Sequence, residues 1–106
     1  MASGILGQTN ITAQATQTSV YTVPAGKVAT VNLAILNLGA SSATIRVGIS
    51  TSTTVTAAQY IEYNFVLASS DVFERGGLVL DAGKQIIVYA SHASPNITAF
   101  VTGYEE

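Results

Sequence analysis

Few side chains in this sequence are suited to covalent or metal chemistry. His92 is the single histidine and cysteine is absent, so a Ser-His-Asp or Cys-His site would have to be built on this one imidazole ring. His92 lies in the segment ASHASPN between two expected strands, which is typical of an exposed loop histidine. One histidine with scattered carboxylates also matches no zinc or calcium ligand spacing. The sequence therefore predicts a protein that is not an enzyme, with no catalytic residue, no metal and no cofactor.

Glu62 and Glu74 are the candidates for a pair of catalytic carboxylates. If residues 59–67 and 72–80 form a hairpin, Glu62 lies diagonally across from Arg75 on one face of the strands. Glu74 then faces the opposite side, because side chains alternate along a strand. This register predicts an ion pair between Glu62 and Arg75, and it disfavours a glycosidase arrangement in which Glu62 and Glu74 flank one bond.

Two adjacent glycines, Gly76 and Gly77, are candidates for a phosphate-binding element. No helix is expected after them, and no Lys-Ser or Lys-Thr pair completes a phosphate-binding loop. The pair therefore favours a β-bulge or a close approach of two backbones.

Aromatic side chains are the remaining candidates for ligand binding. They could form a platform on which sugar rings stack, or they could anchor contacts between subunits. The absence of tryptophan and the scarcity of charged hydrogen-bonding residues favour interface anchors over a carbohydrate site. The residues concerned are Tyr60, Tyr63, Tyr89, Phe100 and Tyr104.

Alternation of apolar and polar residues with a period of two predicts strands along most of the chain, and helical periodicity is nearly absent. Seven or eight short strands separated by turn-forming residues indicate an all-β antiparallel sandwich, with a jelly roll as the favoured wiring. The polar stretch 50–59 is expected to be a loop that crosses between the two sheets. The expected strands are near 18–23, 27–37, 42–50, 59–67, 72–80, 84–91 and 96–104, after an extended segment around 8–15.

The chain divides into two expected parts. Residues 1–17 are predicted to form an extended N-terminal arm, and residues 18–106 a single β-sandwich domain. The arm is uncharged and alternates apolar with polar residues, so it can add as a strand to the sheet edge of another subunit. Its first residues contain no Lys, no Arg and no long apolar run. This is not the pattern of a Sec signal peptide.

Three of the expected strands carry apolar residues on both faces. In residues 27–37, one face supplies core residues, and Val28 and Leu36 lie on the opposite face. Residues 84–91 and 96–104 also carry apolar side chains on both faces. Helices cover such strands in other folds, but none is expected here. The N-terminal segment folding back or a neighbouring subunit could cover them, and the neighbouring subunit is favoured, with the arm contributing. The residues predicted to lie at this interface are Ile11, Val28, Leu36, Ile87, Tyr89, Phe100 and Tyr104.

Composition supports a role in packing against other chains. Charged residues make up 9% of the sequence and the net charge is −2, whereas a typical soluble domain contains about 25% charged residues. Hydroxyl and amide groups lose their water at a lower cost than ions do. The sequence therefore predicts a homo-oligomer, with a trimer favoured, and it predicts neither nucleic acid nor membrane as a partner.

One family resemblance covers about residues 20–106. The runs YTVPAGKVATVNLAILN, ATIRVGIS, YIEYNFVL and FERGGLVLDAGKQIIVYAS, with the closing VTGYEE, resemble short virion structural proteins of tailed bacteriophages, particularly those of cyanobacterial viruses. The resemblance implies a small β-sandwich subunit repeated many times on a capsid or tail, with no active-site residues.

The expected function follows from that resemblance together with the two-faced strands. We expect a capsid decoration or cement subunit, located in the virion, whose partners are copies of itself and other virion proteins such as the major capsid protein. The alternative is a tail- or fibre-associated module that binds a receptor or a glycan.

Overall fold

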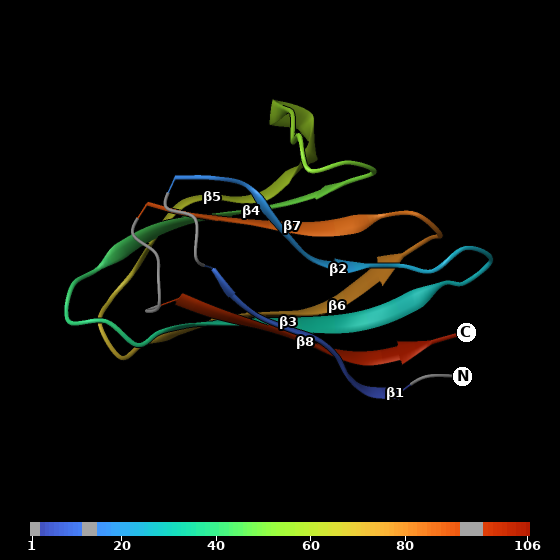
Figure 1. Ribbon diagram of the computed structural model, residues 1–106, viewed down its shortest axis with the longest axis horizontal. Coiled ribbons are helices and arrows are strands. Elements are labelled where there is room, and N and C mark those ends of the chain that lie inside the picture. Colours follow the sequence, from blue (N-terminus) through green and yellow to red (C-terminus); the bar gives the residue numbers. More distant parts are fainter. Residues whose placement is uncertain (1–2, 12–14, 92–96) are drawn as a thin grey trace.

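The computed structural model describes residues 3–11, 15–91 and 97–106. These residues form two four-stranded antiparallel sheets that face each other, with one turn of 3-10 helix, η1 (Ala57–Gln59), beside them (Figure 1). Sheet A contains, in spatial order, β1 (Ser3–Ile11), β8 (Ile97–Glu105), β3 (Ala29–Asn37) and β6 (Val72–Leu80). Sheet B contains β2 (Thr18–Thr22), β7 (Gln85–Ala90), β4 (Ala43–Ser50) and β5 (Tyr60–Leu67). The predicted antiparallel β-sandwich is confirmed.

The strand order 1-8-3-6 against 2-7-4-5 fits the wiring of a jelly roll, in which most connections cross from one sheet to the other. The connection from β4 to β5 is different, because it joins neighbouring strands of sheet B. The stretch 50–59 lies in this connection, so the prediction that it crosses between the sheets was wrong.

Part of the predicted N-terminal arm is a strand of the sandwich itself. β1 pairs with β8 of the same chain, from Ser3 opposite Tyr104 to Ile11 opposite Ile97. Ile11 is completely buried among core residues. Its prediction as an interface residue was wrong, because the sheet that buries it belongs to its own chain.

The core lies between the two sheets and is built by the predicted alternation. In β3 the buried positions are every second residue from Ala29 to Asn37, and β4, β7 and β8 contribute in the same way. A fully buried Val, Leu or Ile side chain stabilises the folded state by about 1.5 to 3 kcal/mol relative to its exposure. The largest buried side chains of this core are Ile11, Leu33, Ile35, Ile45, Leu67, Ile86 and Ile97.

Every edge strand contains a β-bulge, whereas the central strand pairs do not. β3 and β8 remain in register over nine consecutive pairs, and β4 and β7 pair without a shift. The four bulged strands are β1, β2, β5 and β6, each at the side of a sheet. Because a bulge interrupts the ladder of free N–H and C=O groups, these edges are poor templates for adding another strand.

Asn37 is a buried polar residue that holds two loops together at the end of β3. Its Nδ2 donates to the carbonyl oxygens of Ser41, at 2.9 Å, and Leu67, at 3.0 Å. Its Oδ1 accepts from the N–H of Gly39 at 2.9 Å. The side chain thereby ties the β3–β4 loop to the end of β5, which belongs to the other sheet.

A second polar link joins the sheets at the opposite end of β8. The hydroxyl of Tyr21, in β2, donates to Oε2 of Glu105 at 2.6 Å. Burial of Tyr21, the hydrogen bond and the negative charge of Glu105 together raise the pKa of Tyr21 well above its ordinary value.

We predict that Asn37→Ala lowers the free energy of unfolding by about 2 to 4 kcal/mol, because it leaves buried backbone groups without hydrogen-bond partners. Asn10→Ala is the matched control, since Asn10 is exposed on β1. It should change the free energy by less than about 1 kcal/mol. Urea denaturation measures both, and equal effects of the two variants would contradict the role given to Asn37.

The Tyr21–Glu105 bond predicts a loss of stability in alkali. Above about pH 10, tyrosine ionises in the unfolded chain while Tyr21 stays protonated in the folded protein, so the folded state binds more protons and unfolding becomes easier as pH rises. The free energy of unfolding should fall with pH more steeply in the wild type than in Tyr21→Phe, by up to about 1.4 kcal/mol per pH unit. Denaturation curves measured from about pH 8 to 11 test this. Parallel profiles for the two proteins would show that Tyr21 does not contribute.

Candidate functional site

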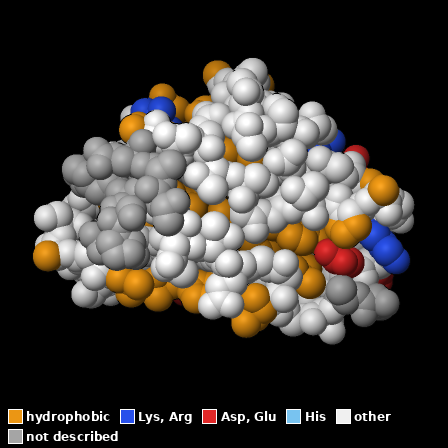
Figure 2. Space-filling view, in the orientation of Figure 1, with side chains coloured by type: hydrophobic (Ala, Val, Ile, Leu, Met, Phe, Trp, Pro, Cys, Tyr) orange, Lys and Arg blue, Asp and Glu red, His pale blue; other side chains and the backbone are white. Residues whose placement is uncertain are grey.

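The outward side chains of sheet A form a surface rich in exposed apolar groups, which we call the sheet A face. The register between β3 and β8 points residues 30, 32, 34 and 36 outward beside residues 104, 102, 100 and 98. Figure 2 shows hydrophobic side chains along the lower margin of the molecule, where sheet A lies. The apolar members of the face are Ile5, Val28, Ala34, Leu36, Val72, Val79, Phe100 and Tyr104.

Two polar side-chain oxygens of the sheet A face already have hydrogen-bond partners in the chain. Oδ1 of Asn10 accepts from the hydroxyl of Thr98 at 2.6 Å. Oδ1 of Asn32 accepts from the N–H of Gly77 at 3.2 Å. A second surface that covers this face would therefore not leave these atoms unpaired, and the cost of removing their water is reduced.

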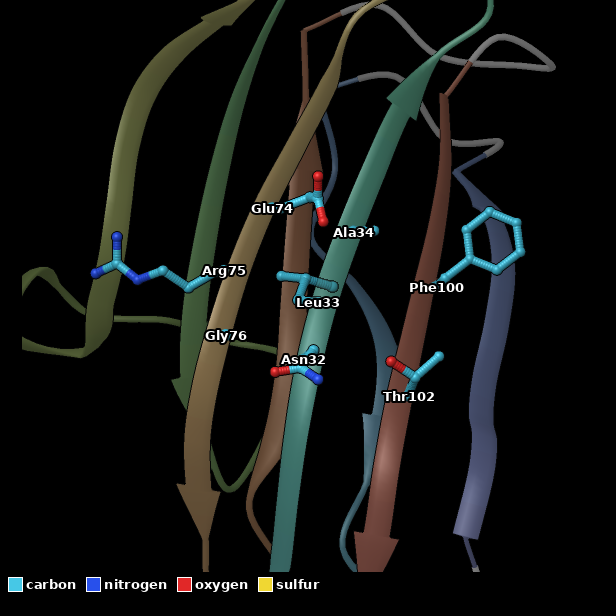
Figure 3. Close-up of a pocket in the computed structure, with 8 residues that line it drawn as sticks. All are labelled: Asn32, Leu33, Ala34, Glu74, Arg75, Gly76, Phe100 and Thr102. Atoms are coloured by element: carbon cyan, nitrogen blue, oxygen red, sulfur yellow. The ribbon is translucent and has the colours of Figure 1, made fainter.

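A hollow of about 250 Å³ interrupts the sheet A face where β3 and β6 meet (Figure 3). It lies beside the bulge of β6, where Gly76 and Gly77 together oppose Asn32. Gly77 adopts a φ of 70°, a left-handed conformation that favours glycine. The predicted bulge at these glycines is confirmed. The lining residues are Asn32, Leu33, Ala34, Glu74, Arg75, Gly76, Phe100 and Thr102.

Small residues leave room for the hollow, since Gly76 has no side chain. A Cβ atom placed on Gly76 would lie 3.0 Å from Oδ1 of Asn32, so even an alanine would crowd this position. Ala34 is small, and Phe100 stands on the β8 side of the opening (Figure 3). The result is a depression lined by both polar and apolar residues, large enough for a small side chain of a partner.

The outer face of sheet B is partly covered by the chain's own loop. Val55 packs over Gly48, the register partner of Ile87. Its N–H donates to Oε1 of Gln17 at 3.1 Å, which fixes the loop beside β2. Ile87, which pairs with Gly48, is 1% exposed. Its prediction as an interface residue was wrong, because an intramolecular loop supplies the cover.

Beyond that loop, sheet B carries a cluster of tyrosines around one arginine. The guanidinium carbon of Arg46 lies 4.4 Å from the ring centroid of Tyr63 and 4.5 Å from that of Tyr89. Its Nε donates to Oδ1 of Asn64 at 2.7 Å. The ring of Tyr60 contacts that of Tyr63 edge to face, with centroids 5.0 Å apart. We call these five residues the tyrosine–arginine cluster.

The bulge in β5 builds this cluster. Tyr63 and Asn64 together oppose the single residue Arg46, and Asn64 has a φ of 54°. Asparagine tolerates this left-handed conformation better than most residues do. The extra residue turns both side chains toward the arginine. Alternation alone places Tyr63 and Asn64 on opposite faces, so the sequence analysis did not find the cluster.

The structure divides the remaining predicted interface residues between two surfaces. Val28, Leu36, Phe100 and Tyr104 belong to the sheet A face, and Tyr89 lies on the outer face of sheet B. The five aromatic residues considered as one platform are thus on opposite sides of the sandwich. Whether any of these residues contacts a partner remains a prediction.

The predicted ion pair between Glu62 and Arg75 does not form. Nη2 of Arg75 donates instead to the carbonyl oxygen of Ile61 at 3.2 Å. Within residues 3–11, 15–91 and 97–106, the ion pair present is that between Lys84 and Asp81, at 3.2 Å, which lowers the pKa of Asp81. The prediction was wrong because it assumed a hairpin, whereas β5 and β6 belong to different sheets.

Other kinds of site have little support in the part of the chain that the structure describes. No group of three or more metal-ligating side chains occurs among these residues. Among the same residues, no helix has the length and apolar character needed to cross a lipid bilayer. His92 lies outside the described residues.

Comparison with known proteins finds a likeness in structure but none in sequence. No protein-family model and no curated protein matches this chain. Two crystal structures of a pentameric capsid protein isolated from metagenomic phage sequences are similar to it, one of them solved by iodide phasing. The first is 13% identical with a TM-score of 0.45, and the second is 12% identical with a TM-score of 0.44. Each match covers 94% of this chain but only 62% or 63% of the other, so this chain spans less than two thirds of their length.

Proposed function

We propose that this protein is a structural subunit of a bacteriophage virion, and more specifically a capsid decoration or cement subunit. The observation that carries the proposal is the sheet A face, which carries several exposed apolar side chains on a protein with few charges. Large exposed apolar patches mark sites of protein contact. The sequence resemblance to short phage virion proteins supports the same role.

The sheet A face is large enough for a specific contact. Four strands about 4.8 Å apart and nine residues with a rise of about 3.3 Å span roughly 19 by 30 Å. The accessible area of such a face, side chains included, approaches the ~800 Å² that each partner contributes to a standard interface. The hollow beside Gly76 provides a socket in which one anchoring side chain can be desolvated, which is where interface energy concentrates.

We propose that assembly uses this face rather than strand addition at the sheet edges. The bulges of β1, β2, β5 and β6 disfavour pairing with another chain's backbone. A face contact between apolar side chains has no such requirement. It also fits the repeated, individually modest contacts that hold a particle together.

The proposed partners are copies of this chain and other virion proteins, among them the major capsid protein. A trimer remains the favoured oligomer. Native mass spectrometry of the isolated chain tests this directly, because it resolves a trimer from a pentamer or a monomer. A monomer that binds only to a preformed capsid lattice would favour decoration over self-assembly.

The alternative role, a tail- or fibre-associated module that binds a receptor or a glycan, is favoured by a different observation. This is the tyrosine–arginine cluster on sheet B, whose rings are exposed in part. The two roles use opposite faces of the sandwich and do not exclude each other.

We predict that Val79→Glu weakens self-association at least tenfold, because it places a charge in an apolar contact. Val66→Glu is the matched control: Val66 is 63% exposed on sheet B and Val79 is 67% exposed on sheet A, so neither change disturbs the core. Sedimentation equilibrium measures the association constants. Equal association constants for the two variants would contradict the assignment of the interface to sheet A.

The apolar character of the contact also predicts that assembly is nearly insensitive to salt between about 0.05 and 0.5 M, a range over which exposed ionic contacts are strongly screened. Dissociation on raising the salt concentration would contradict an apolar interface. The virion role itself is tested by quantitative mass spectrometry of purified phage particles, in which this chain should be present in many copies.

A further inference from the structure

The tyrosine–arginine cluster has the features of a ligand site that the proposed assembly role does not use. It lies on sheet B, away from the sheet A face. A cavity of about 550 Å³ adjoins it, lined by Ala57, Tyr60 and Tyr63. This volume falls in the roughly 300 to 1,000 Å³ range of small-ligand sites.

The cavity has an ordered wall. Gln17 donates from Nε2 to the hydroxyl of Tyr60 at 2.9 Å and accepts from Val55 at its Oε1. At the start of η1, the N–H of Thr56 donates to Oε1 of Gln59 at 2.8 Å. These bonds fix the loop and the Tyr60 ring before any ligand arrives, so that binding loses less conformational entropy.

Arg46 is held in place but has no anionic partner among the described residues. Two rings hold its guanidinium group and Asn64 engages Nε. The Nη atoms make no hydrogen bond to the described residues. A guanidinium group in this state is suited to binding a carboxylate through two parallel hydrogen bonds.

The neighbouring groups favour a sugar over other carriers of a carboxylate. Tyr63 is 55% exposed and presents an aromatic ring against which the apolar side of a pyranose can pack. Thr56 and Gln59, which precede the lining residues Ala57 and Tyr60 in the sequence, add uncharged donors and acceptors of the kind that suit hydroxyl groups. A stacking ring, uncharged polar groups and a cation without an anionic partner are together complementary to an acidic saccharide.

We propose that the tyrosine–arginine cluster binds a saccharide that carries a carboxylate, with Tyr63 stacking on the sugar ring and Arg46 holding the carboxylate. This inference deepens the alternative role named above, and it is independent of the contact proposed for the sheet A face.

The test uses saturation-transfer NMR and calorimetry on the whole chain with three probes: oligomers of galacturonic acid, glucuronic acid and sialic acid. At least one should bind with a dissociation constant of about 1 mM or tighter, the weak end of specific affinity. Its methyl ester, which keeps the ring but loses the charge, should bind at least tenfold more weakly. Absence of binding by all three probes would overturn the proposal, as would equal binding of acid and ester.

Variants locate the site. Tyr63→Ala should weaken binding at least tenfold, whereas the matched control Tyr104→Ala, on sheet A and 40% exposed, should not change it. Arg46→Gln should abolish the preference for acid over ester, and Arg46→Lys, which keeps the charge, should restore part of it. Binding that survives both Tyr63→Ala and Arg46→Gln would show that Arg46 is only a clamp between strands.

The salt dependence of binding distinguishes this proposal from the assembly proposal. Acid binding should weaken as salt rises, because it depends on one exposed charge pair, whereas assembly should not. Val79→Glu should leave saccharide binding intact. Each proposal can therefore fail while the other holds.

Discussion

The unbroken pairing of β3 with β8 is the constraint on which the rest of sheet A depends. Nine consecutive residue pairs, from Ala29 opposite Glu105 to Asn37 opposite Ile97, remain in register. Because the side-chain period of a strand is two, a slip of one residue would exchange the core face with the outer face. This register therefore buries Val31, Leu33 and Ile35 and, at the same time, leaves the apolar sheet A face outward.

The two sheets treat their outer faces differently. Sheet B covers Ile87 with a loop of its own chain and gathers its tyrosines around Arg46. Sheet A has no comparable cover among the described residues, and Val79 is largely exposed there. Exposed apolar side chains therefore occur on both sheets: those of sheet A extend over several strands, whereas Tyr63, Phe65 and Val66 of sheet B all lie on β5.

Bulges occur in all four edge strands of the sandwich. They interrupt the edge ladders, which limits uncontrolled strand addition, and they create local features that regular strands lack. In β6 the bulge of Gly76 and Gly77 opens the hollow in the sheet A face. In β5 the bulge at Asn64 turns Tyr63 toward Arg46. Irregular positions at the edges thereby shape both proposed sites.

The sequence by itself determined where β2 to β8 lie and which residues of β3 and β8 point inward, and it indicated a bulge or a close backbone approach at Gly76–Gly77, because alternation and turn chemistry are local properties of the chain. It did not determine which strands share a sheet, and the assumed hairpin of 59–67 with 72–80 gave a wrong partner for Arg75. Tertiary structure alone decided that Ile11 and Ile87 are covered within the chain and that Tyr63 meets Arg46. These outcomes depend on contacts between residues far apart in the sequence, and a period-two pattern does not predict such contacts.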